Sequence, residues 1–209
     1  MTGNVTPAAR RIGFGKYRGV ALDVGVWDAV GADVDLSCAC MFTHEIGPGP
    51  TGGLEHLDGA LSGALLKLRR DGIFRGDSME TLMLTPGSLI QGQALLIVGL
   101  GDPEAWNASM MYRVKRYMIA EANSRGVTSA GIAPSLLESG MPAGLAGSGS
   151  EAMFDGVVTG IDAAYHLAEM GLASPPSLAA WTFGAGAEHA DEAAEYFRHC
   201  LSSVTVAPN

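Results

Sequence analysis

Two glycine-rich stretches stand where the chain could bind an anion. "THEIGPGPTGG" (43–53) and "SGMPAGLAGSGS" (139–150) each precede a helical pattern. The first N–H groups of a helix have no intrahelical partner and lie at the positive end of its dipole, so phosphates and carboxylates bind there. The residues predicted to line such a site are Gly52, Gly53, Ser139, Gly140, Met141, Gly147 and Ser148. Glycines that serve only tight turns would give the same pattern.

The sequence offers little for covalent or metal chemistry. "GSGSE" (147–151) lacks the Gly-x-Ser-x-Gly elbow, and Ser150 is predicted to be the N-cap of a helix that begins near Glu151. Cys38 and Cys40 have no second cysteine pair, so two buried thiols on one face of a strand are favoured over a zinc site. No acid–base pair lies in either glycine-rich stretch. We therefore assign no catalytic residue, no metal site and no cofactor.

The elements that would position these stretches alternate along the chain. Apolar runs predict strands, and amphipathic stripes between most of them predict helices. Strands are expected at 20–26, 34–42, 80–85, 94–100, 127–133 and 177–183, and helices at 54–70, 106–118, 151–168 and 193–201. This alternation predicts an α/β fold with a mainly parallel sheet and helices on both faces. The two glycine-rich stretches would then face one shared crevice at the carboxyl ends of the strands.

Length and charge restrict the class of protein. A chain of 209 residues suits one domain, and a net charge of −9 argues against nucleic-acid or anionic-membrane binding. No apolar run approaches the roughly 20 residues that span a bilayer, and the N-terminus does not resemble a signal peptide, so a cytoplasmic protein is expected. Arg10, Arg11, Lys16 and Arg18 crowd the start of the chain. Residues 1–19 are therefore predicted to be a flexible basic arm and residues 20–209 a single domain.

Three short motifs carry a resemblance to a known family. Leu61-Ser62-Gly63, Met79-Glu80-Thr81-Leu82 and Val98-Gly99-Leu100-Gly101 resemble, in order and spacing, elements of the N-terminal domain of the leucyl (cytosol) aminopeptidases. The resemblance implies a three-layer fold similar to the ADP-ribose-binding macro domains. The family's metal-binding catalytic domain, with its Asn-Thr-Asp-Ala-Glu-Gly-Arg motif, has no counterpart in this sequence, so peptidase activity is not expected.

The macro-domain ligand site is matched only in part. Ser37 and Cys40 stand where macro domains carry asparagines, and Asp28 is the one acid near the position that contacts adenine. The resemblance therefore implies a non-catalytic macro-like module for assembly or regulation, acting by self-association or with a protein partner. The alternative is a binding module, or a hydrolase, for ADP-ribose, a nucleotide or another phosphate-bearing metabolite at the glycine-rich stretches.

Overall fold

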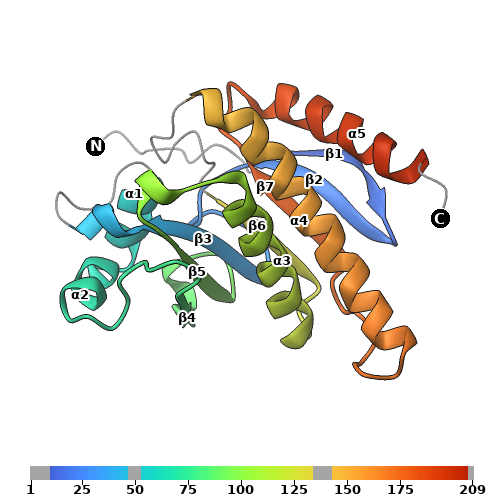
Figure 1. Cartoon of the computed structure of the whole chain (residues 1–209). Helices are drawn as coiled ribbons and strands as arrows, with labels where there is room; N and C mark the ends of the chain where they lie inside the picture. Colours follow the sequence, from blue (N-terminus) through green and yellow to red (C-terminus); the bar gives the residue numbers. More distant parts are fainter. Residues whose placement is uncertain (1–9, 47–52, 134–142, 207–209) are drawn as a thin grey trace.

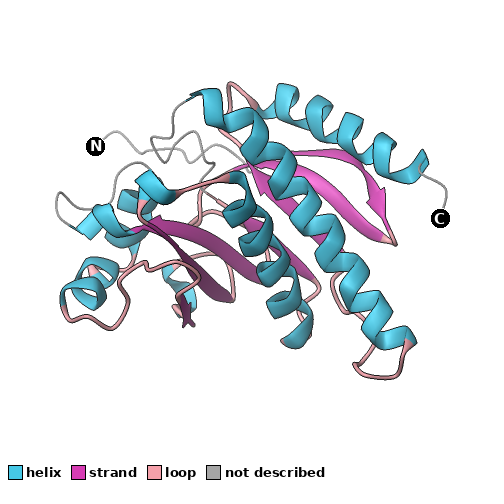
Figure 2. Ribbon diagram, in the orientation of Figure 1, coloured by secondary structure: helices cyan, strands magenta, loops and turns pink. Residues whose placement is uncertain are grey.

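A seven-stranded mixed sheet runs through the computed structural model, which describes residues 10–46, 53–133 and 143–206 (Figures 1 and 2). Its strands, in chain order, are β1 (Arg10–Tyr17), β2 (Val20–Val26), β3 (Leu36–Phe42), β4 (Thr81–Leu84), β5 (Ala94–Gly101), β6 (Ser129–Ile132) and β7 (Ala180–Gly184). The spatial order is β1-β2-β7-β6-β3-β5-β4. The five inner strands are parallel, whereas β1 and β4 pair antiparallel at the two ends. The predicted fold class is confirmed.

Helices cover both faces of the sheet and make it the middle of three layers (Figure 1). One face carries α1 (Gly53–Ala60) and α2 (Ala64–Arg70), and the other carries α3 (Ala108–Ser124), α4 (Ala143–Glu169) and α5 (Ala190–Val206). Short 3₁₀ turns are η1 (Thr43–Ile46), η2 (Gly87–Leu89) and η3 (Pro103–Ala105). Within the described residues, no helix is long and apolar enough to span a membrane.

Strand β3 lies at the centre of the core, and all seven of its residues are buried. Cys38 and Cys40 face the layer of α3, α4 and α5, whereas Ala39 and Met41 face α1 and α2, as the two-residue period of a strand requires. The prediction of two buried thiols on one side of a strand is confirmed.

The segment expected to be a basic arm is ordered from Arg10 onward. Residues 10–17 form β1, which pairs with β2, while residues 1–9 lie outside the described part. Phe14 is buried against Phe183 and Phe197, and Arg10 forms an ion pair with Asp191. The many charges suggested a solvated tail because an edge strand exposes one face, so cations alternate there with residues that pack.

Two predicted helix boundaries are wrong. The leucine stripe at 54–70 is two helices, because Ser62 and Gly63 have positive φ angles of 57° and 77° and the side chain of Asp58 accepts from the N–H groups of Leu65 and Leu66. The other error concerns Ser150, which lies inside α4 rather than at its N-cap. Small residues such as Gly147 and Gly149 suggested a loop, yet the helix includes them.

Candidate functional site

The carboxyl edge of the parallel strands is the place where a site was predicted. β3 and β6 are neighbouring parallel strands, so the segments that follow them leave the sheet at the same edge. The first of these segments leads to α1 at Gly53, and the second leads to α4 at Ala143. The expectation that the two helices follow strands ending at one edge is confirmed.

The predicted ligand-binding residues are only partly described. Gly52, Ser139, Gly140 and Met141 lie outside the described residues. Gly53 is the first residue of α1, whereas Gly147 and Ser148 follow the first turn of α4. In a helix, the unbonded N–H groups belong to that first turn, residues 143–146. Binding of an anion by the predicted set therefore stays a prediction.

Asp28 and His56 form a pair at this edge that sequence reasoning missed. Oδ1 of Asp28 accepts from the N–H groups of Val30 (3.0 Å) and Gly31 (2.9 Å), while Oδ2 contacts Nδ1 of His56. The histidine side chain is 63% exposed. Asp28 follows β2 and His56 belongs to α1, so no local spacing could have revealed the pair. The carboxylate that lies near the expected adenine-contacting position is thus already bonded to its own turn and to a neighbouring helix.

Glu45 and Arg69 hold the turn that follows β3. Buried Glu45 accepts from the N–H of Phe42 (2.6 Å), and burial raises the pKa of this carboxyl group. Nη2 of Arg69 donates to the carbonyl groups of Phe42 (3.0 Å), Thr43 (2.8 Å) and Arg75 (3.0 Å). Arg69 is therefore not simply a cation that complements the α2 dipole, because it joins the end of β3 to the segment before β4.

Lys115 is a fully buried amine in the layer of α3 and α4. Burial lowers the pKa of Lys115 and raises the pKa of the neighbouring thiols of Cys38 and Cys40. Nζ of Lys115 has no hydrogen-bond partner among the described residues. The close approach of α4 helps to enclose it, since a Cβ at Gly156 would lie 3.0 Å from Cβ of Lys115. Its surroundings favour the neutral amine over the ammonium ion.

The motifs around Glu80 and Gly99 meet in space and build the junction of β4 with β5. Gly99 donates to the carbonyl of Glu80 (2.7 Å), and Met79 donates to the carbonyl of Gly99 (3.0 Å). A Cβ at Gly99 would lie 2.1 Å from the carbonyl oxygen of Asp77, so only glycine permits this approach. The carboxylate of Glu80 accepts from the N–H groups of Arg75 (2.7 Å) and Asp77 (3.0 Å). These motif residues hold backbone in place.

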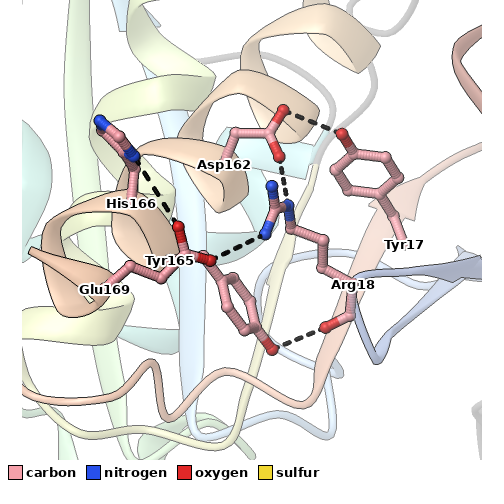
Figure 3. Close-up of polar contacts among 6 residues, drawn as sticks. All are labelled: Tyr17, Arg18, Asp162, Tyr165, His166 and Glu169. Atoms are coloured by element: carbon pink, nitrogen blue, oxygen red, sulfur yellow. Dashed lines mark hydrogen bonds and ion pairs between the residues drawn. The ribbon is translucent and has the colours of Figure 1, made fainter. Parts of the chain in front are cut away.

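A second polar cluster lies at the opposite, amino edge of the parallel strands, where the β1–β2 turn meets the end of α4 (Figure 3). Asp162 accepts from Tyr17 (2.9 Å) and Arg18 (2.6 Å), and the hydroxyl of Tyr165 donates to the carbonyl of Arg18 (2.6 Å). Arg18 also contacts Glu169 at 3.5 Å, and Glu169 contacts His166 at 3.8 Å. Burial raises the pKa of Tyr17, and its hydrogen bond to Asp162 adds to the rise. The cluster fastens the hairpin to α4.

No metal-binding group is evident in residues 10–46, 53–133 and 143–206. Nowhere in these ranges do three or more histidine, cysteine, aspartate or glutamate side chains gather as a metal ion would require. The polar side chains described above instead contact backbone groups or one another. Both edges therefore have polar clusters whose visible contacts stabilise the fold.

Comparison with protein families gives one match. The family model described as "Cytosol aminopeptidase family, N-terminal domain" matches residues 44–156. No curated protein matches the sequence. The matched range includes Met79–Leu82 and Val98–Gly101, the two motifs that meet at the β4–β5 junction.

Comparison with solved structures gives the fold. A mutant of tomato leucine aminopeptidase is 16% identical with a TM-score of 0.60; the match covers 88% of this chain and 37% of the tomato chain. The Oceanobacillus iheyensis macrodomain with MES bound is 11% identical with a TM-score of 0.67, over 94% and 99% of the two chains. The Trypanosoma brucei macrodomain in complex with ADP is 17% identical with a TM-score of 0.58, over 87% and 68%. At these identities the likeness establishes the fold alone, and the chain spans little more than a third of the tomato enzyme.

Proposed function

The chain belongs to the cytosol aminopeptidase family through its N-terminal domain, and from this premise we propose that it is a non-catalytic macro-like module that acts by assembly. It associates with itself or with a protein partner, and it acts in the cytoplasm. The family's peptidase activity is not part of the proposal, because the chain spans only 37% of the tomato enzyme.

The observation that carries the proposal is what the family motifs do in this fold. The motif residues Glu80 and Gly99 spend their hydrogen bonds and their lack of a side chain, respectively, on the backbone that holds β4. At the carboxyl edge, Asp28, Glu45 and Arg69 likewise bond to nearby backbone groups. Groups held in this way support a rigid surface rather than a reacting centre.

Sedimentation velocity over a wide concentration range tests the proposal. We expect the mean sedimentation coefficient to rise with concentration, or a protein partner to co-purify in stable stoichiometry, because association follows mass action. A chain that sediments as a monomer at every concentration, and that also co-purifies with no partner, contradicts the proposal.

A second candidate is binding of a phosphate-bearing ligand, such as ADP-ribose or a nucleotide. Its support is that α1 and α4 both follow strands ending at the carboxyl edge, so N–H groups at two helix N-termini can converge there. The macrodomain structures that share the fold include one with ADP and one with ADPR. Titration with ADP-ribose, ADP and inorganic phosphate should then raise the melting temperature. An unchanged melting temperature at millimolar ligand contradicts this candidate.

A further inference from the structure

Strand β4 is the last strand of the sheet in the described part of the chain, so one side of its backbone faces away from β5. Gly99 donates to the carbonyl of Glu80, and the register pairs Thr81 with Val98 and Leu82 with Ile97. In an antiparallel pair, residues that exchange hydrogen bonds alternate with residues whose N–H and C=O groups point outward. By this alternation, Leu82 and Leu84 bond to β5, and Thr81 and Met83 direct their backbone groups away from it.

This outer side is accessible and uncharged. Thr81 is exposed and the other three residues of β4 are half-buried. Thr-Leu-Met-Leu has no charge, no proline and no glycine, the features by which natural edge strands avoid pairing. Just before and after it along the chain, Ile73 and Leu89 are 61% and 50% exposed.

From these observations we infer that β4 is an interface that pairs antiparallel with β4 of a second copy of this chain, so that two sheets become one. The inference rests on the proposed assembly function and names its surface. In the register that opposes Thr81 to Met83 of the second copy, both outward N–H groups and both outward carbonyl groups of each strand find partners. The side chains of Leu82 in the two copies then meet as a close, non-hydrogen-bonded pair.

Charge favours a second copy on this edge and disfavours it on the other. Two β4 strands oppose no like charges across their four residues. Two β1 strands would instead bring Arg10, Arg11 and Lys16 against their own copies, which is destabilising. A bulge between Gly13 and Gly15 also interrupts β1. Because β4 is only four residues long, the expected dimer is weak and depends on protein concentration.

Met83→Pro tests the inference because it removes an outward N–H group and leaves the β4–β5 hydrogen bonds in place. Two interfacial hydrogen bonds are lost per dimer, so sedimentation should give a dimerisation constant weaker by about tenfold or more. The matched control is Met83→Leu, which keeps the backbone donor and nearly the same volume and should dimerise like the wild type. Thr81→Pro, against Thr81→Val, repeats the test at an exposed position should Met83→Pro fail to fold.

Amide hydrogen exchange locates the interface independently. The Thr81 and Met83 amides should exchange more slowly as wild-type concentration rises, while amides of β1 stay unchanged. Wild-type association that neither proline weakens overturns the inference and leaves the assembly function standing, since another surface then mediates it. A monomeric wild type with a co-purifying partner also overturns only the inference. A monomer without any partner overturns both.

Discussion

Strand β1 ends the sheet with eight residues and β4 ends it with four. β1 exposes Arg10, Arg11 and Lys16, contains a bulge, and is covered on one face by α5 through Phe14 and Phe197. β4 has no charge along its length, and its strength comes from the segment before it, where Glu80 and Gly99 fix the backbone.

This difference shows how the two edges divide their roles. Charge and a bulge make β1 a poor template for another strand. β4 lacks these devices, yet it is held by the residues that the cytosol aminopeptidase family model includes. The family motifs are thus best understood as the support of an uncharged, pairable edge. Each prediction below compares a change near β4 with a change near β1.

The largest effect is expected at Gly99. Its substitution by alanine places a Cβ 2.1 Å from the Asp77 carbonyl oxygen and 2.5 Å from the Gly76 carbonyl carbon, so backbone must move. We expect Gly99→Ala to lower the free energy of unfolding by about 3 kcal/mol. On β1, Gly13→Ala would bring a Cβ 3.3 Å from an Asp23 side-chain oxygen, which can shift, so a loss below about 1 kcal/mol is expected. Urea denaturation measures both, and equal losses would contradict the comparison.

A smaller loss is expected at Glu80. Glu80→Ala removes the carboxylate that accepts from the N–H groups of Arg75 and Asp77, at a cost of about 1–2 kcal/mol. Its counterpart is Arg10→Ala on β1, which removes an ion pair between side chains that are 54% and 73% exposed. That pair is screened by water, so the change should be about 0.5 kcal/mol or less. If thermal melts rank Arg10→Ala as the more damaging change, the role given to Glu80 is wrong.

The same contrast explains how far the sequence could be interpreted. Alternating apolar strands and helices predicted the sheet and its class, because burial of strands such as β3 leaves a continuous apolar run. The cations of β1 hid a strand, because charge count carries no information about which face of a strand is exposed. The bonds of Arg69 and the Asp28–His56 pair join residues distant in sequence, so only the folded chain reveals them.

The turn at the start of β2 gives a third prediction. Arg18 has a positive φ of 44° and contacts Asp162, Glu169 and the ring of Tyr165 (Figure 3). Because its side chain is 41% exposed, Arg18→Ala should cost less than about 1 kcal/mol. Arg18→Gly removes the same contacts but adopts a positive φ without strain, so it should be closer to the wild type than alanine is. Chemical denaturation of the two variants measures the order, and the reverse order would contradict this account of the turn.

The smallest effect concerns pH and belongs to the β1 end alone. Burial raises the pKa of Tyr17, and its hydrogen bond to Asp162 raises it further, so the folded state keeps this proton at a pH where the unfolded chain begins to lose it. Since the folded state then binds more protons, stability is full below the unfolded pKa of about 10 and falls as pH rises through the folded value. Tyr17→Phe should flatten that decline in urea midpoints measured between about pH 9 and 11. Tyr196, whose pKa burial raises to about 12, is present in both proteins, so the difference between the two curves isolates Tyr17. An unchanged slope in Tyr17→Phe would show that the hairpin contact to Asp162 contributes nothing at this edge, and the charged side chains of β1 would then be its main protection.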